Sequence, residues 1–533
     1  MKLTKPILFV LAGVVVVASV ILVAQQRHSV KAEFSNDGLK SLRSGGFDFL
    51  ESGGFVVHDV VLRSPSGETR PGPTDGDYKF NVERQELNRT FPWGKIKVTY
   101  NTAHNRLLLT VATTNTSDSD MIQSVWYQPL TLKFPAKVKE YDGSIPLLAH
   151  NVGQVAVSKA SFESGALAVV SEDVAKPLLV GFPWADNKPQ NTVFPLSVST
   201  GRVTSYPDSI PAINRPIAPK ATDEFHLSIR FGPASETEAE FAFDMYKKFG
   251  QVYPAKLNWP DRRPIGAIFL ASSGETTENN PRAWFNDHNL NTNTSSGCAE
   301  FRRTILAIAD GAVTIMKDMN AQGAITWDIE GQEYTHANYV GDPRMLNEIA
   351  PEMANVADEY FARFRNANLR VGICVRPQQL KLSADKKNAT QVSLADPTQL
   401  LIDKIAYAKK RWGASIVYID SNINSYDSNP MDVRVLEKVS AAFPDILLVP
   451  EHSNLQYYAY SAPYRELRAG FTGTPRTTLD TYPKAFTLIY TADGLIDYYH
   501  KDLARAVKNG DTLMYRTWWR DPQNDKVKDL STR

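Results

Sequence analysis

The chain has 533 residues, of which 43% are hydrophobic and 22% are charged, a composition typical of globular proteins. This length exceeds what one ordinary hydrophobic core organises, so two or three domains are expected. The 59 lysines and arginines balance 58 aspartates and glutamates, and the resulting net charge of +1 does not favour nucleic acid as a partner.

The N-terminal segment indicates the compartment. Lys2 and Lys5 precede a run of apolar residues at 6–24 that is long enough to cross a bilayer. A cleavable signal peptide would have its site after Ala32, although the apolar run exceeds the typical signal core of about 7–15 residues. We therefore expect residues 1–32 to be a signal peptide or a membrane anchor. Either would place the remaining chain outside the cytoplasm, as a periplasmic, secreted or membrane-anchored protein.

Residues 35–233 predict an all-β domain. Short segments in which polar and apolar residues alternate, such as KIKVTY at 95–100 and EFHLSIRFG at 224–232, are separated by clusters of Gly, Pro, Asn and Asp. Helical periodicity is almost absent, and the pattern is typical of a β-sandwich. The following region, 234–261, contains apolar residues at helical spacing, with Ser235 as a candidate N-cap, and predicts a linker helix.

From residue 262 to the C-terminus, strand-like and helix-like segments alternate. The eight candidate strands are 265–271, 323–328, 370–376, 415–420, 446–451, 470–474, 486–491 and 512–517. Helical stretches at 304–320, 351–367 and 396–412 lie between them. This order predicts a (β/α)8 TIM barrel over 262–533, so the whole chain reads as a multidomain protein with an all-β domain followed by an α/β domain.

A doubly wound open sheet is the alternative to the barrel. That fold usually carries a glycine-rich phosphate loop after its first strand, and this sequence has none there. Only sixteen residues follow the last candidate strand, so the eighth helix must be short or missing.

Polar residues end several of the candidate strands, on the side where barrel enzymes carry their active sites. The strand ends and the residues just after them supply Asp328 and Glu330 (strand 2), Arg376 (strand 3), Asp420 and Asn422 (strand 4), Glu451 and His452 (strand 5), and Arg516 and Trp518 (strand 8). Cleavage of a glycosidic bond needs one carboxylic acid to protonate the leaving oxygen and one carboxylate to attack the anomeric carbon or to activate water, and it needs no cofactor. The sequence therefore predicts a glycoside hydrolase with a carbohydrate substrate.

A β-sandwich, a linking helix and a (β/α)8 barrel in this order resemble the layout of several families of retaining α-glycosidases. In the α-galactosidase-like clan an Asp that ends strand 4 is the nucleophile, and VYID at 417–420 is similar to that signature. In the α-amylase clan the acid/base Glu ends strand 5, as Glu451 does in LLVPEHSN. The resemblance thus implies Asp420 as nucleophile and Glu451 as acid/base.

The chain also departs from both clans. Tyr418 stands where the amylase pattern has an Arg, two residues before the nucleophile, and no strand-7 His-Asp pair is found. The α-galactosidase-like clan takes its acid from a strand-6 Asp, and the candidate strand at 470–474 ends in none. The resemblance supports a glycoside hydrolase and names no single family.

Roles for the surrounding residues follow from their positions. We expect Asp328 to bind substrate, with Glu330 as the alternative acid/base and Glu333 as part of a loop. Arg376 would act as a substrate clamp or as an ion-pair partner of Asp328. The remaining substrate-binding candidates are Asn422, His452, Arg516 and Trp518.

Two other functions use the same residues. The carboxylates together with His452 would suit a divalent metal in a metal-dependent hydrolase, although the His spacing is not compact. A non-catalytic carbohydrate-binding protein is the third reading. The only cysteines, Cys298 and Cys374, would be able to pair in an oxidising compartment, but Cys374 lies in the apolar run VGICV and reads first as a buried residue.

Overall fold

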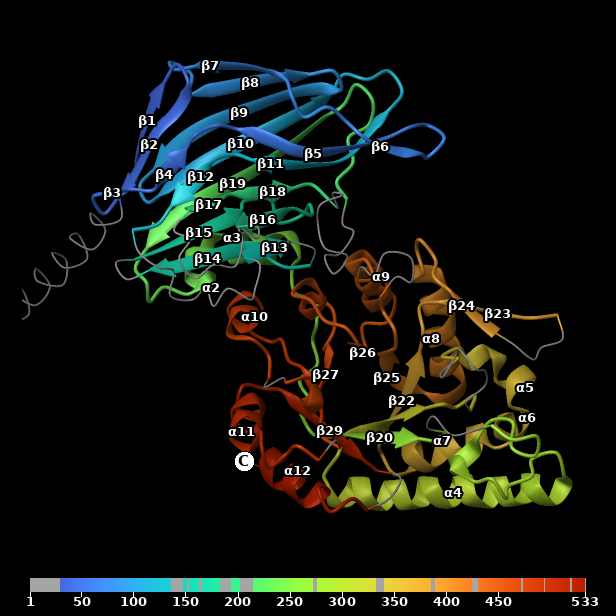
Figure 1. Ribbon diagram of the computed structural model, residues 1–533. Helices are drawn as coiled ribbons and strands as arrows, with labels where there is room; N and C mark the ends of the chain where they lie inside the picture. The colour runs from blue at the N-terminus through green and yellow to red at the C-terminus, as the bar shows by residue number, and fades with distance from the viewer. Residues whose placement is uncertain are drawn as a thin grey trace, which may run out of the picture. The chain divides into compact units, whose positions relative to one another are not determined.

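The structure is a computed structural model that describes residues 29–135, 147–150, 153–162, 165–182, 193–201, 214–271, 276–331, 340–384, 389–423, 430–470, 473–492, 494–517 and 520–532. The chain divides into two compact units, Met1–Val252 and Tyr253–Arg533 (Figure 1), and each is described by itself. The expected export segment at 6–24 lies outside the described residues. Among the helices that the structure describes, none is both long enough and apolar enough to cross a membrane.

The first unit is a β-sandwich of antiparallel sheets, which confirms the predicted fold class. Its seven-stranded sheet has the order β14 (Val157–Phe162), β15 (Gly165–Ser171), β19 (Thr222–Gly232), β10 (Arg106–Asn115), β9 (Gly94–Ala103), β8 (Glu86–Phe91) and β7 (Asp77–Asn81). Its six-stranded sheet has the order β13 (Leu147–His150), β16 (Leu179–Phe182), β18 (Ser197–Ser199), β11 (Met121–Gln128), β5 (Val56–Arg63) and β6 (Thr69–Pro71). The unit also has two three-stranded sheets. One has the order β1 (Lys31–Ser35), β2 (Gly38–Ser44) and β3 (Phe47–Asp48), and the other has the order β17 (Val193–Pro195), β12 (Thr131–Lys133) and β4 (Leu50–Ser52).

Alternation along the strands explains the sandwich core. In β9, Ile96 and Val98 are buried while Lys95 and Lys97 are exposed, because successive side chains point to opposite faces of a strand. The buried faces of the large sheets form one hydrophobic cluster. The predicted period of two is therefore the pattern that builds this unit.

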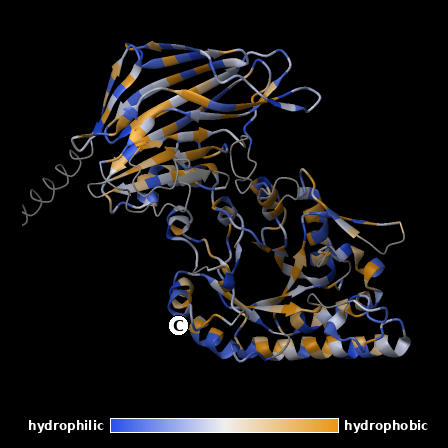
Figure 2. Cartoon of the chain, in the orientation of Figure 1, coloured by the Kyte–Doolittle hydropathy of each residue, from blue (hydrophilic) through white to orange (hydrophobic). Residues whose placement is uncertain are grey.

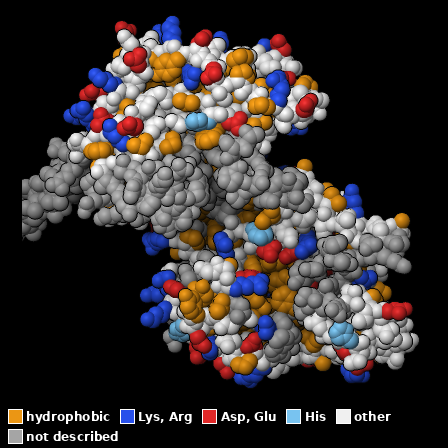
Figure 3. Space-filling view, in the orientation of Figure 1, with side chains coloured by type: hydrophobic (Ala, Val, Ile, Leu, Met, Phe, Trp, Pro, Cys, Tyr) orange, Lys and Arg blue, Asp and Glu red, His pale blue; other side chains and the backbone are white. Residues whose placement is uncertain are grey.

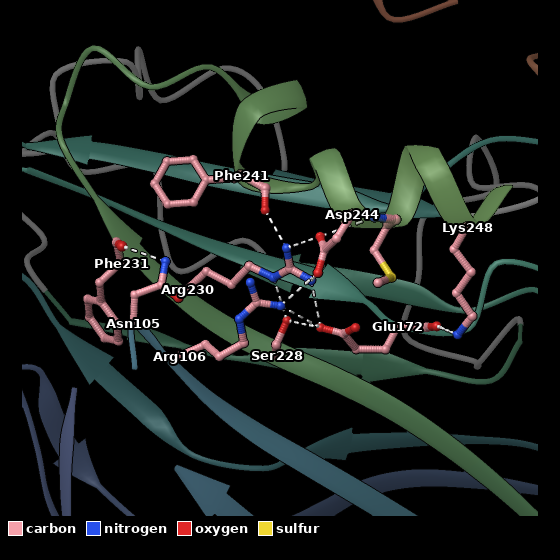
Figure 4. A network of polar contacts seen from close by, with 10 residues as sticks. Asn105, Arg106, Glu172, Ser228, Arg230, Phe231, Phe241, Asp244 and Lys248 are labelled. Atoms are coloured by element: carbon pink, nitrogen blue, oxygen red, sulfur yellow. Dashed lines mark hydrogen bonds and ion pairs between the residues drawn. The ribbon is translucent and has the colours of Figure 1, made fainter. Parts of the chain in front are cut away.

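A buried ion-pair network fastens the helical end of the first unit to its large sheet (Figure 4). The predicted single helix is split into α2 (Glu238–Phe241), which begins with a capping box at Thr237, and α3 (Phe243–Val252). Arg230 of β19 is buried and pairs with Glu172 at 2.7 Å and with Asp244 of α3. Arg106 of β10 lies 2.9 Å from the same aspartate. Helix α3 is thus tied to two strands by charge-assisted hydrogen bonds.

The second unit is the predicted barrel. One eight-stranded sheet has the order β26 (Leu447–Pro450), β25 (Ala414–Ile419), β22 (Arg370–Val375), β21 (Gly323–Trp327), β20 (Ile265–Phe269), β29 (Thr512–Arg516), β28 (Leu488–Tyr490) and β27 (Tyr464–Glu466). All of its ladders are parallel, and the first strand, β20, pairs with the last, β29. The sheet therefore curls round on itself; within the described residues no ladder joins β26 to β27.

Helices follow most of the barrel strands. They are α4 (Ser295–Asp318), α5 (Leu346–Ile349), α6 (Pro351–Ala354), α7 (Ala357–Asn366), α8 (Thr398–Trp412), α9 (Val433–Ala442), α10 (Arg476–Thr481), α11 (His500–Lys508) and α12 (Asn524–Ser531), and a hairpin of β23 (Gln379–Leu382) and β24 (Ala389–Val392) follows β22. Helix α4 alternates hydrophobic and hydrophilic residues along its length (Figure 2), and its buried residues Phe301, Ile305 and Ala309 recur every four positions. The last helix, α12, has only eight residues, so the eighth helix is short as expected.

The sixth barrel strand is not where the sequence placed it. Of the expected strand at 470–474, residues 471–472 lie outside the described residues. The described ones are not in a strand, because Gly470 ends a 3₁₀ turn in a left-handed conformation (φ 74°) and residues 473–474 form no strand. Strand β27 lies earlier, at Tyr464–Glu466, and pairs with β28 over its three residues. So short a strand carries almost no periodic signal, and its neighbour in the sheet determines its conformation.

Candidate active site

Four neighbouring barrel strands end in polar side chains. Asp328 directly follows β21, Arg376 follows β22, Asp420 follows β25 and Glu451 follows β26. Because these strands are parallel and adjacent, their C-terminal ends meet at one edge of the sheet. The fold thus brings together the carboxylates and the guanidinium that the sequence singled out.

Asp420 is buried and held by two donors. Nε of Arg376 donates to Oδ2 of Asp420, and Oγ of Ser421 donates to the same oxygen at 3.2 Å. Arg376 is therefore hydrogen-bonded to Asp420. A charge-assisted hydrogen bond of this kind is shorter and stronger than a neutral one and fixes the orientation of the carboxylate.

Glu451 is joined to the end of the neighbouring strand. Its Oε2 accepts a 2.7 Å hydrogen bond from the backbone nitrogen of Ser421, which has a left-handed backbone (φ 52°). Nε2 of His452 lies 3.4 Å from the same oxygen. Burial, and then the negative charge of Asp420, raise the pKa of Glu451. A carboxyl group that keeps its proton to higher pH is suited to act as a general acid.

Asp328 and Glu330 are both buried, and each has an oxygen without a partner. Asp328 has a left-handed backbone (φ 56°), which is costly for a residue other than glycine. Oδ1 of Asp328 and Oε1 of Glu330 have no hydrogen-bond partner among the described residues. Burial raises the pKa of Asp328 well above its usual range and that of Glu330 to about 8. The protonated form of Glu330 therefore predominates at neutral pH, and the unpaired oxygens of both groups suit a hydroxyl-bearing ligand or water.

Five aromatic rings form a closed layer inside the barrel. Centroid distances are 4.9 Å for Phe269–Trp327, 4.8 Å for Trp327–Tyr418, 5.2 Å for Tyr418–Tyr464, 6.2 Å for Tyr464–Tyr490 and 6.4 Å for Phe269–Tyr490. Trp327 and Tyr418 immediately precede the strand ends that carry Asp328 and Asp420. The carboxylates thus stand on an apolar floor, which lowers the local polarity and strengthens their electrostatic interactions.

Three further predicted residues have other surroundings. The side-chain amide of Asn422 makes two hydrogen bonds to the backbone of His452. Its Nδ2 donates to the carbonyl oxygen of His452 at 3.1 Å, and its Oδ1 accepts from the backbone nitrogen of His452 at 2.8 Å. Asn422 thus links the loops after β25 and β26. Arg516 donates to the carbonyl of Ala492 at 3.3 Å and to Asp521 at 3.4 Å. Trp518 lies outside the described residues, as does Glu333.

The cysteines are not joined. Cys374 is buried in β22, and Cys298 is half-buried in α4 with its thiol 3.1 Å from the carbonyl of Thr292. Both are free thiols, and no disulfide links the barrel elements that carry them.

Sequence reasoning missed Glu466, the last residue of β27. Its carboxylate accepts from Oη of Tyr464 at 2.9 Å and from Nε of Arg468. Its negative charge is among the causes that raise the pKa of Glu451. Because the sixth strand was expected at 470–474, this carboxylate was not considered as a strand end. The sequence signal for this strand is the short run from Tyr464 to Glu466 directly after Pro463.

Figure 3 shows acidic side chains and a histidine gathered beside hydrophobic side chains on the second unit. In the described part of the chain, no group of three or more His, Cys, Asp or Glu residues is arranged to hold a metal ion.

Comparison with known proteins gives a match at the level of structure alone. No protein-family model matches the sequence, and no curated protein matches it by sequence. Among solved structures, the chain is similar to the α-N-acetylgalactosaminidase NagBb from Bifidobacterium bifidum in complex with GalNAc, with 10% identity, coverage of 95% of this chain and 91% of that one, and a TM-score of 0.50. It also matches the galactosidase domain of the α-galactosidase–sucrose kinase AgaSK, with 10% identity, coverage of 94% and 76%, and a TM-score of 0.45. The likeness to NagBb shows a shared fold across nearly the whole chain.

Proposed function

We propose that this protein is a glycoside hydrolase that acts by a retaining mechanism on a carbohydrate substrate. The observation that carries the proposal is the placement of Asp420 and Glu451 at the ends of paired strands, with Ser421 bonded to both carboxylates. The fold shared with NagBb adds support, because that protein is a glycosidase of the same architecture.

Each carboxylate has a distinct role. An oxygen of Asp420 attacks the anomeric carbon while the glycosidic C–O bond breaks, and Glu451 gives its proton to the leaving oxygen. Water then attacks the same carbon, its proton passes to Glu451, and the bond to Asp420 breaks. Arg376 holds the Asp420 carboxylate in place for the first step, and the raised pKa of Glu451 favours its acid form.

Strand order favours retention of the anomeric configuration. Neighbouring strands lie about 4.8 Å apart, which suits the roughly 5–5.5 Å separation of a retaining pair better than the roughly 6.5–9.5 Å of an inverting pair. Glu466, whose charge acts on Glu451, is one competing acid/base, and Glu330 is the other. Glu451 is favoured because it alone of the three is bonded to the residue next to Asp420.

Sugar hydroxyls would form hydrogen bonds with the unpaired oxygens of Asp328 and Glu330. Oδ1 of Asp328 and Oε1 of Glu330 can each accept a hydrogen bond, and protonated Glu330 can also donate one. Phe269 and Tyr490, the two partly buried rings of the layer, supply apolar surface for the face of a sugar ring.

A screen of aryl glycosides tests the proposal. Wild-type protein should release aryl alcohol from at least one α-glycoside, with N-acetyl-α-galactosaminide and α-galactoside among the substrates, and Asp420→Asn should not. Activity that requires an added divalent metal and vanishes with a chelator would favour the metal-dependent hydrolase instead. Sugar binding by calorimetry without turnover on any substrate would favour the non-catalytic reading.

A further inference from the structure

A buried lysine lies behind the candidate active site. Lys404 is on α8, on the same face as the buried Leu401 and Ala408, and its side chain is 0% exposed. Its Nζ donates to the carbonyl oxygen of Arg376 at 2.8 Å and to that of Gln378 at 3.0 Å. Burying an ammonium group is costly unless hydrogen bonds and a counter-charge offset the loss of water, so its position requires an explanation.

The two carbonyls that Lys404 binds belong to Arg376 and Gln378, whose side chains form hydrogen bonds with Asp420 and Ser421. Arg376 donates from its side chain to Asp420, and Nε2 of Gln378 donates to the carbonyl oxygen of Ser421 at 2.7 Å. Ser421 in turn donates to both Asp420 and Glu451. A single ammonium group thus fixes the backbone segment whose side chains hold both proposed catalytic carboxylates.

We propose that Lys404 is a positioning residue for the reaction, acting through Arg376 and Gln378 on Asp420 and Glu451. The inference rests on the proposed glycoside hydrolase function of this site. Lys404 itself touches neither carboxylate of the pair, so its effect is on their geometry and not on the chemistry of either.

The surroundings of Lys404 agree with a charged group held in place. Oδ2 of Asp342 lies 3.7 Å from its Nζ, and Arg344 makes two hydrogen bonds to the same aspartate, at 2.8 and 2.7 Å. Burial lowers the pKa of Lys404 to about 8, and the negative charge of Asp342 opposes this shift. The ammonium form therefore predominates at neutral pH, with two of its three donors bonded to fixed backbone carbonyls.

Two matched substitutions test the proposal. Lys404→Met removes the ammonium group and keeps much of the side-chain volume. Arg344→Met removes a cation from the same aspartate and leaves in place the bonds of Lys404 to the carbonyls of Arg376 and Gln378. We expect Lys404→Met to lower kcat roughly tenfold or more with KM changed by less than about twofold, because small displacements of catalytic groups cost rate and not ground-state binding. Arg344→Met should keep both constants close to wild type.

Crystal structures of the two variants give a readout independent of activity. The pairs Arg376–Asp420 and Gln378–Ser421 should be displaced in Lys404→Met and retained in Arg344→Met. If Lys404→Met does not fold, Gln378→Leu tests the same link and should lower kcat in the same way. If the wild-type protein has no glycosidase activity, the proposed function is overturned. If the wild type is active, the positioning role is overturned by either of two results. One is a Lys404→Met variant with unchanged kcat and unmoved residue pairs, and the other is a Gln378→Leu variant with unchanged kcat.

Discussion

The backbone nitrogen of Ser421 lies 2.7 Å from Oε2 of Glu451. Ser421 directly follows Asp420, so this hydrogen bond joins the ends of two adjacent barrel strands and fixes one carboxylate relative to the other. Ser421 itself has a left-handed backbone (φ 52°). Strained residues of this kind persist where the surrounding structure over-determines them, which is frequent at active sites.

Replacing the proposed nucleophile should abolish turnover. Asp420→Asn removes the attacking charge and should lower kcat by roughly a thousandfold or more, while the barrel stays folded because Asn keeps the shape of Asp. Proton NMR of the wild-type reaction should show the α-anomer of the sugar as the first product from an α-glycoside. The exposed Asp529→Asn is the control and should leave kcat unchanged. An inverted first product would mean that the pair is instead Asp420 with Asp328 or Glu330 across the barrel.

Glu451 and Glu466 can be separated by leaving-group chemistry. If Glu451 is the acid/base, Glu451→Gln should lose roughly a hundredfold or more in kcat on substrates with poor leaving groups. With good leaving groups the first step needs no acid, so a glycosyl-enzyme should accumulate and be detectable by intact mass spectrometry. Glu466→Gln should show neither effect. The reverse pattern in these two variants would assign the role to Glu466.

Arg376 should tolerate no other cation. Lysine cannot reproduce the planar guanidinium that donates to Asp420, so Arg376→Lys should lower kcat/KM roughly tenfold to a hundredfold without unfolding the barrel. Arg370→Lys, at the start of the same strand and 4.4 Å from the ring of Trp259, is the matched control and should keep activity. Full activity in Arg376→Lys would remove this residue from the site.

Glu330 should make stability depend on pH. Burial raises its pKa from 4.5 to about 8 in the folded protein, so folding takes up a proton between these values and the free energy of unfolding falls as pH rises through this window. Glu330→Gln has no titrating group at this position. The free energy of unfolding of this variant relative to wild type should therefore rise between about pH 5 and about pH 8, by at most about 1.4 kcal/mol per pH unit. Urea unfolding across this range measures the difference. The exposed Glu300→Gln should show no such trend, and a constant difference for Glu330→Gln would contradict the prediction.

The ion-pair network of the sandwich should hold helix α3 in place. Arg230→Met leaves Glu172 and Asp244 without their buried partner, with only Arg106 of this network still beside them. The variant should therefore weaken the attachment of α3 to the sheet. Amide hydrogen exchange in residues 243–252 should accelerate in this variant. Arg303→Met removes a largely exposed pair with Glu300 and should leave exchange there unchanged. Unaltered protection in Arg230→Met would show that apolar contacts alone retain the helix.

The sequence by itself determined the order of domains and the edge where the site lies. Period-two alternation in segments such as 95–100 specifies strands with one buried face, and the change to alternating strands and helices after 262 specifies a parallel barrel. Parallel strands place their C-terminal ends together, so Asp328, Arg376, Asp420 and Glu451 were identifiable as neighbours from their positions after apolar runs.

Tertiary structure alone decided how these residues pair. Arg376 bonds to Asp420 because the ends of β22 and β25 are adjacent, a contact between residues far apart in the chain that no local pattern encodes. The three-residue strand β27 is too short for its own sequence to specify a strand. It forms because it pairs with β28, and this pairing places Glu466 at a strand end. Lys404 looks in sequence like a surface lysine near the middle of a helix, although it falls on the apolar face with Leu401 and Ala408. Only the backbone carbonyls that the folded barrel presents to it make its burial favourable.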